Sequence, residues 1–304
     1  MKIAIIVGMR FGKLALNLLK YIIKNDIRKR RKHYPPHLFD EFINVPYIDD
    51  NNINHTYDVY LAKEENRKRV CIINIHGGTY IFGEHKDNYP YVYEWLNEGY
   101  DALLVDYQYN NGNSDIYDLV SDSVKCINHF LNNLKKYNLE NDRFVISGDS
   151  AGGHLALLIS ELFSNKELQT KLGLELPDID IVATVLHCPV YDFANIGDGA
   201  LSPSGLKRML GPKGIDKNHL SIYSPKTYID GFKNPIFVST CTNDFIRKES
   251  LKINADLSKR GDFLFVDIES DDKNIGHVHN VINIELKESK RVNRLAMEFV
   301  SKYL

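Results

Sequence analysis

The chain has few cysteines and no motif that pairs them. Its 304 residues include four, and none of the four belongs to a C-x-x-C pair. Most of them lie within apolar runs such as VCIINI and FVSTC, which favours buried free thiols in a reducing compartment over a disulfide framework. The four are Cys71, Cys126, Cys188 and Cys241.

An excess of charge of one sign is also missing. The 38 basic and 40 acidic residues give a formal net charge of -2, so no overall field would recruit nucleic acid or an anionic membrane. The one dense local run is RKRRK at residues 28–32, which comes after a helical pattern. We interpret it as solvated cations near the negative end of that helix, and we expect no nucleic-acid partner.

No hydrophobic run is long enough to cross a bilayer. The apolar stretch from Ile3 to Met9 is closed by Arg10, and Lys13 and Lys20 interrupt the next segment of the chain. Neither a transmembrane segment nor a signal peptide is therefore predicted, and a cytoplasmic location is the default expectation.

An amphipathic helix is predicted near the N-terminus. Residues 11–27 carry apolar side chains at helical spacing, and Pro35-Pro36 closes the segment. We interpret residues 1–45 as a cap region whose helix packs on the main domain. An interfacial membrane helix is the alternative, so peripheral contact with a membrane stays open.

From residue 46 to residue 304, apolar strand patterns alternate with helical ones. Such alternation predicts an α/β domain with a mainly parallel central sheet and helices on both faces. A glycine- and proline-rich insertion interrupts the domain at about residues 190–232. Together with the N-terminal helix, this insertion is suitable material for a lid over the carboxyl edge of the sheet. The predicted strands are residues 55–61, 70–75, 102–106, 144–147, 181–186, 235–240 and 263–268.

The strongest local signal is GDSAG at residues 148–152, a G-x-S-x-G motif between a predicted strand and a predicted helix. In this context the motif exposes a nucleophilic serine at the edge of an α/β sheet. The glycines leave room for a strained turn, and the helix N-terminus behind it favours developing negative charge. Ser150 is therefore the predicted nucleophile.

A second glycine turn, His76-Gly77-Gly78-Thr79, comes after the strand VCIINI about 70 residues before the serine. Attack by a serine on an ester carbonyl creates an oxyanion, and backbone N–H groups approach it closely where glycines carry no side chain. We predict that Gly77 and Gly78 supply two donors of an oxyanion hole. The backbone N–H of Ala151 would be the third.

A serine nucleophile needs a general base and a carboxylate that orients this base, and in this fold they come after it in the order acid, histidine. Asp244 lies just beyond the strand PIFVST and is the predicted acid, with a helix N-cap as the alternative role. The loop DDKNIGHVHN offers His277 and His279 as the base. An H-x-H pair can bind metal, but no further ligand cluster accompanies it, so no metal is predicted.

Several segments taken together resemble the hormone-sensitive-lipase family of α/β-hydrolases, from about Tyr57 to the C-terminus. The resemblance implies the α/β-hydrolase fold, the HGG turn as oxyanion hole and Ser150 as nucleophile. Its register selects His277 over His279, and His279 is expected in a pocket position that the family fills with an aromatic residue. The segments are HGGTYIFG at 76–83, DY at 106–107, GDSAGG at 148–153, ND at 243–244 and the histidine loop.

The chain departs from this family at three places. Thr79 replaces the third glycine of HGGG, QYNNGN replaces the acidic-proline segment after DY, and the N-terminal region matches nothing distinctive. The string GDSAGGHLAL is also similar to acetyl esterases acting on sugars and to kynurenine formamidases, so substrate preference stays open.

The sequence therefore predicts a serine carboxylesterase that hydrolyses small-acyl esters through Ser150, His277 and Asp244. It needs no cofactor, and its partner is a small-molecule ester. Tyr80 and residues of the insertion are predicted to shape the acyl pocket. The alternatives are amide or formamide hydrolysis by the same residues, a non-catalytic ligand-binding protein on a hydrolase scaffold, and a lipase at a membrane surface. The oligomeric state is not predicted.

Overall fold

The computed structural model describes residues 34–110, 113–196 and 203–304, together with residues 21, 25, 27, 28, 31 and 32. Most of the predicted N-terminal helix, residues 11–27, lies outside the described residues. The same holds for part of the predicted insertion, residues 197–202.

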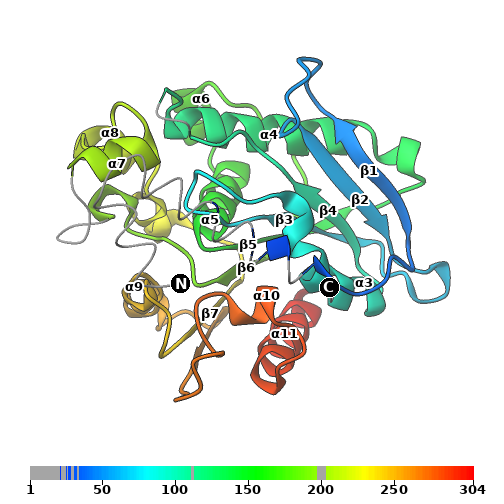
Figure 1. The fold of residues 1–304 in the computed structure, drawn as a ribbon. Coiled ribbons are helices and arrows are strands. Elements are labelled where there is room, and N and C mark those ends of the chain that lie inside the picture. The colour runs from blue at the N-terminus through cyan, green and yellow to red at the C-terminus, as the bar shows by residue number, and fades with distance from the viewer. Residues whose placement is uncertain are drawn as a thin grey trace.

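An eight-stranded sheet forms the centre of the molecule, with the strand order β1-β2-β4-β3-β5-β6-β7-β8 (Figure 1). In this order, all strands from β4 through β3 and β5 to β8 pair in parallel, and the antiparallel strands β1 and β2 lie at one edge. The prediction of a mainly parallel sheet is thus confirmed. The strands are β1 (Asp40–Pro46), β2 (Thr56–Leu61), β3 (Val70–Ile75), β4 (Asp101–Val105), β5 (Arg143–Asp149), β6 (Asp180–His187), β7 (Ile236–Cys241) and β8 (Phe263–Ile268).

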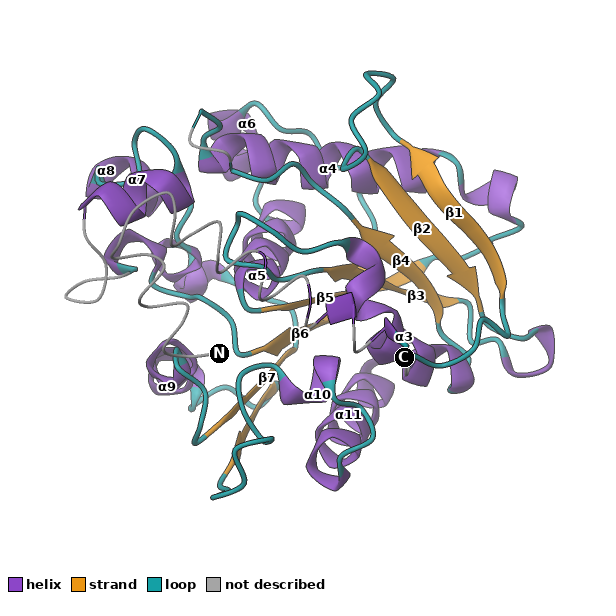
Figure 2. Ribbon diagram, in the orientation of Figure 1, coloured by secondary structure: helices purple, strands orange, loops and turns teal. Residues whose placement is uncertain are grey.

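Helices cover both faces of this sheet (Figure 2). Alternate residues of β3 point to opposite faces, so Ile73 belongs to a core formed with α4 and α5, whereas Ile72 belongs to a core formed with α3 and α11. The described helices are α3 (Tyr89–Asn97), α4 (Ile116–Asn132), α5 (Ala151–Ser164), α6 (Lys166–Leu172), α7 (Pro203–Leu210), α8 (Lys217–Ile222), α9 (Arg247–Leu257), α10 (His279–Ile282) and α11 (Lys287–Val300).

Strand β1 lies within the segment that the sequence assigns to the N-terminal cap. It pairs with β2 from Asp40 to Pro46, so the sheet begins six residues before the predicted domain boundary at residue 46. All seven of its residues are exposed or half-buried, which leaves no apolar stripe in the sequence. The predicted boundary is therefore too late, because an exposed edge strand carries little periodic signal.

Helix α5 carries a carboxyl group into the core. Glu161 is only 2% exposed, and neither of its carboxylate oxygens has a hydrogen-bond partner in the described part of the chain. Burial raises the pKa of Glu161 well above its usual range, so the group is held in its neutral form. The folded protein therefore retains a proton on the Glu161 carboxyl group, whereas the unfolded chain releases it above about pH 4.3.

Replacing Glu161 by glutamine is expected to stabilise the protein increasingly as the pH rises. Because the pKa is raised in the folded state, the wild type loses about 1.4 kcal/mol of stability for each pH unit above the unfolded pKa, until the folded pKa is reached. The glutamine variant has no such loss of stability with pH, because its side chain does not ionise. Urea unfolding of both proteins at pH 5 and pH 8 measures the difference, and Glu167→Gln, an exposed change on α6, is the control. An equal difference at both pH values would contradict the prediction.

Candidate active site

Ser150 occupies the sharp turn between β5 and α5, and its backbone is strained. Its φ of 54° and ψ of -118° lie in a region that residues with a side chain rarely adopt. The Ser150 N–H donates to the His187 carbonyl at 2.9 Å, which fixes the turn to the end of β6. The turn therefore projects the serine from the carboxyl edge of the sheet.

The glycines of the motif are required by close backbone contacts. A Cβ added at Gly152 would lie 2.1 Å from the carbonyl oxygen of Ile75, and one at Gly148 would lie 2.3 Å from that of Gly152. Both distances are far below van der Waals contact. The GDSAG sequence therefore allows the first turn of α5 to pack against the end of β3.

The structure brings together the three residues predicted as a triad. His277 Nε2 lies 2.9 Å from Ser150 Oγ, and His277 Nδ1 lies 2.6 Å from Asp244 Oδ1. Asp244 comes after β7 and His277 after β8, so the parallel strands deliver all three side chains to one edge. These contacts form the hydrogen-bonded chain that a serine nucleophile, a general base and an orienting carboxylate require.

The second histidine of the loop turns away from this chain. His279 is buried, and its Nδ1 lies 2.9 Å from the Ser289 hydroxyl. Among the described residues, Val278 and Ile282 line the cavity at Ser150, and His279 does not. The expectation that His279 occupies a pocket position is therefore wrong.

Asp244 is held as a carboxylate by three donors. Besides His277, it accepts hydrogen bonds from the Thr240 hydroxyl at 2.8 Å and from the Ile246 N–H at 3.0 Å. Burial alone would raise the pKa of Asp244, but these donors and the nearby imidazole lower it below its usual value. The ring of Phe245 packs on that of His277, with centroids 4.2 Å apart, and the imidazole is thereby fixed from two sides.

The glycine turn lies beside Ser150, but its donors differ from those predicted. The Gly77 N–H donates to Asp149 Oδ1 at 3.0 Å, so this group is occupied and cannot also meet an oxyanion. In the described part of the chain no hydrogen bond occupies the N–H of Gly78, and that of Ala151 begins α5, where no intrahelical partner exists. The structure therefore contradicts the prediction for Gly77, and it leaves Gly78 and Ala151 as available donors.

Gly78 adopts a conformation that its position requires. Its φ is 134°, and a Cβ there would lie 1.7 Å from the Phe82 carbonyl oxygen. Thr79 comes next with a φ of 54°, which is rare for a β-branched residue. The turn therefore holds strained backbone at the point where the third glycine of the resembling family is replaced.

Asp149 joins the glycine turn to the serine turn, a role that the sequence did not reveal. It accepts from Gly77 N–H and, at 2.8 Å, from the Asn88 side-chain amide. Burial raises the pKa of Asp149. Only its place beside the serine in GDSAG could have drawn attention to it.

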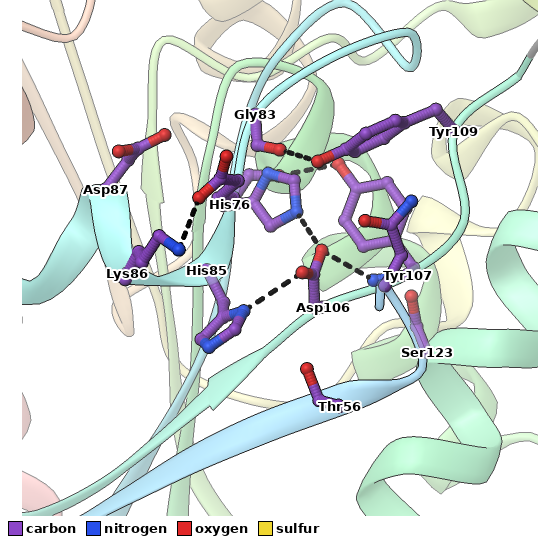
Figure 3. A network of polar contacts seen from close by, with 12 residues as sticks. Thr56, His76, Gly83, His85, Lys86, Asp87, Asp106, Tyr107, Tyr109 and Ser123 are labelled. Atoms are coloured by element: carbon purple, nitrogen blue, oxygen red, sulfur yellow. Dashed lines mark hydrogen bonds and ion pairs between the residues drawn. The ribbon is translucent and has the colours of Figure 1, made fainter. Parts of the chain in front are cut away.

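A second buried hydrogen-bond network fixes His76, at the start of the glycine turn (Figure 3). Asp106 lies between two imidazoles, 2.9 Å from His76 Nε2 and 3.0 Å from His85 Nδ1. Burial opposes the charged form of His85, but Asp106 and Asp58 together raise its pKa to about 9. Tyr107 adds a stacked ring over His76 and donates its hydroxyl to the His76 carbonyl at 2.7 Å. The network thus anchors the residue that precedes Gly77.

Ser150 and His277 open into a cavity of about 100 Å³. Its described lining includes the apolar side chains of Phe82, Phe245 and Ile282, and Ile27 from the N-terminal segment. A second cavity of about 490 Å³ adjoins it and shares Phe82 with it. No described residue of the insertion at 190–232 lines the cavity at Ser150, and residues 197–202 lie outside the described part of the chain.

Tyr80 does not line this cavity in the described structure. Thr79 and Tyr80 both have positive φ values, 54° and 66°, and this turn directs the Tyr80 ring into the core. The ring is 1% exposed, and its hydroxyl lies 3.2 Å from His154 Nδ1. The prediction that Tyr80 shapes the acyl pocket is therefore wrong. Phe82 lines the cavity instead.

All four cysteines are buried and free, which confirms the prediction of buried free thiols.

None of the helices among the described residues has the length and apolar character needed to cross a membrane.

Comparison with known proteins identifies similar sequences and folds. The family model BD-FAE matches residues 57–254. The chain is 28% identical over 172 residues to an arylacetamide deacetylase of Bos taurus, covering 54% of this chain and 42% of that protein. It is 26% identical over 179 residues to a probable carboxylic ester hydrolase, LipM, of Mycobacterium tuberculosis, covering 57% and 41%. The chain thus spans about two fifths of the length of these curated relatives.

The solved structure of esterase B from Lactobacillus rhamnosis superposes on most of the chain. The TM-score is 0.83 at 19% sequence identity, and the alignment covers 94% of this chain and 93% of that one. This similarity confirms the predicted α/β-hydrolase fold.

Proposed function

Because the chain belongs to the BD-FAE family, we propose that it is a serine carboxylesterase that hydrolyses small-acyl esters. The observation that carries the proposal is the unbroken hydrogen-bonded chain from Ser150 through His277 to Asp244. Similarity to a protein named as a probable carboxylic ester hydrolase supports the same reaction. The resemblance to the hormone-sensitive-lipase family points to the same class of α/β-hydrolases.

In this proposal, His277 Nε2 takes the proton of the Ser150 hydroxyl while the serine oxygen attacks the ester carbonyl. The oxyanion of the tetrahedral intermediate accepts hydrogen bonds from the N–H groups of Gly78 and Ala151. His277 then gives the proton to the leaving alcohol, and an acyl-enzyme remains. Water, deprotonated by the same imidazole, attacks the acyl-enzyme and releases the acid. Asp244 stays ionised and stabilises the imidazolium at both stages.

The size of the cavity at Ser150 supports a short acyl group. A volume of about 100 Å³ holds only a few heavy atoms, and apolar side chains such as Phe82 and Ile282 border it. The adjoining cavity of about 490 Å³ has more room and would receive the leaving alcohol.

We expect hydrolysis of p-nitrophenyl esters to be fastest with acyl chains of two to four carbons. The kcat/KM for a twelve-carbon chain should be at least about tenfold lower, because each methylene beyond the cavity loses burial or displaces a side chain. Assays with chains of two to twelve carbons measure the profile. Ile282→Ala should shift the optimum to longer chains, and Ile215→Ala, a change at an exposed side chain, should not. A flat profile in the wild type would refute the assignment of this cavity to the acyl group.

Amide hydrolysis is the second candidate, favoured by similarity to a protein named arylacetamide deacetylase. The same triad would serve, with His277 protonating a leaving amine instead of an alcohol. Rates on p-nitrophenyl acetate, p-nitroacetanilide and N-formylkynurenine distinguish the two reactions. We expect the acetate ester to be cleaved fastest, and a faster anilide or formamide would make the protein an amidase.

A further inference from the structure

We propose that Cys188, Asp244 and His277 form a binding site for a divalent cation of the Zn²⁺ type, and that occupancy of this site inhibits the enzyme. One ligand atom from each of the three residues lies within 4.8 Å of the other two. The inhibition rests on the proposed function of His277 as the base, whereas the binding of the cation does not.

Cys188 reaches the triad because it comes directly after β6, next to the strand that precedes Asp244. Its φ is 48°, and its N–H donates to the Ser239 carbonyl of β7 at 2.7 Å. The Val278 N–H, next to His277, donates to Cys188 Sγ at 3.4 Å. The thiol is thereby held beside His277 and Asp244.

The three side chains offer one nitrogen, one sulfur and one oxygen. This mixed set matches the ligand preference of Zn²⁺, which binds thiolate, imidazole and carboxylate in tetrahedral sites. Three protein ligands leave the fourth position to water. Small movements of these side chains would bring the ligand atoms to bonding distance, because they already lie within 4.8 Å of one another.

Binding of the cation releases one proton in total. The cation bonds to the Cys188 thiolate, and the thiol proton goes to solvent. The cation also takes the lone pair of His277 Nδ1, so the proton that Nδ1 donates to Asp244 in the free enzyme moves to Nε2. Asp244 is ionised before and after binding.

Coordination at Nδ1 disables the base. A neutral imidazole has one nitrogen lone pair, and with that pair bound to the cation Nε2 carries hydrogen. Nε2 then cannot accept the proton of Ser150, although the serine itself is unchanged. Because Cys188 is only 1% exposed, the cation reaches it only when neighbouring side chains move, and inhibition should therefore develop slowly.

The first test is zinc inhibition of chelator-treated protein, measured as ester hydrolysis against ZnCl2 concentration. Cys188→Ala should raise the half-inhibitory concentration by at least about tenfold, because a ligand is lost. Cys241→Ala, a change at another buried free thiol, should leave it unchanged. Thermal unfolding shows whether each variant is folded, and Cys188→Ser replaces Cys188→Ala if the latter is not. Equal inhibition of the Cys188 variant and the wild type would overturn the proposal.

The second test detects binding without activity. Co²⁺ added to Ser150→Ala protein should give the charge-transfer absorption of a Co²⁺–thiolate bond at one equivalent per chain, and the band should vanish when Cys188→Ala is introduced into the same protein. If the band appears in a protein whose wild type hydrolyses no ester, the cation site stands and the proposed function fails. No band, or a band that survives Cys188→Ala, overturns the site whatever the activity.

Discussion

Replacing Ser150 by alanine is expected to lower kcat for p-nitrophenyl acetate by about 10⁴- to 10⁶-fold. The reason is that no other side chain in this turn can form the acyl-enzyme, since Ser150 Oγ alone lies 2.9 Å from His277 Nε2. KM should change far less, because every other residue that lines the cavity is unchanged. Steady-state kinetics of purified wild type and variant, with a covalent fluorophosphonate probe in parallel, measures both the rate and the labelling of the serine.

Ser164→Ala is the matched control, because it removes a hydroxyl at the far end of the same helix, where it is exposed. It should keep full activity and full labelling. A Ser150→Ala protein that retains hydrolysis would refute the nucleophile. A wild type that neither hydrolyses esters nor takes up the probe would instead favour the ligand-binding alternative on the same scaffold.

The parts of the fold with a strong internal pattern were predictable from the sequence. β3 and β8 occupy the predicted residues 70–75 and 263–268, and α5 (Ala151–Ser164) begins directly after Ser150, where the GDSAG motif predicts a helix. Two of these segments are strands in which five of the six residues are apolar, and the third begins at a motif that itself requires a turn and then a helix. β1 gave no such signal, because its side chains face solvent on most positions and its stability comes from pairing with β2.

The site shows the same division between local and long-range information. The order of serine, acid and histidine along the chain pointed to Ser150, Asp244 and His277, since parallel strands deliver their carboxyl ends to one edge. Which backbone N–H groups remain available for an oxyanion could not be inferred in this way. The Gly77 N–H donates to the side chain of Asp149, 72 residues away, and that contact depends on how β3 and β5 pair.

Cys188 shows most clearly which contacts cannot be predicted from the sequence. In the sequence it is one of four thiols in apolar surroundings, 56 residues before Asp244 and 89 before His277. Only the order of β6, β7 and β8 in the sheet places its sulfur beside the triad. A pattern of spacings cannot reveal such a cluster, because its members lie on three separate strand ends.

Asp244→Asn is the second substitution with a large expected effect, a fall in kcat of about 10⁴-fold near neutral pH. The change is isosteric, so Thr240 and Ile246 can still hydrogen-bond to the side chain, and the fold should survive. The variant loses the negative charge 2.6 Å from His277 Nδ1, which orients the imidazole and stabilises its protonated form. Ester hydrolysis by both proteins, with thermal unfolding to confirm the fold, measures the effect.

Two further proteins make this test specific. Asp271→Asn removes an exposed carboxylate from the loop that carries His277, and it should leave kcat within about twofold of the wild type, as surface changes usually do. In a Ser150→Ala background, Asp244→Asn should cause little additional loss, because members of a triad act as a unit and their effects do not add. A full 10⁴-fold loss on top of Ser150→Ala would mean that Asp244 contributes independently of the serine. The carboxylate would then act on some other step, and the assignment of Asp244 as the residue that orients His277 would have to be abandoned.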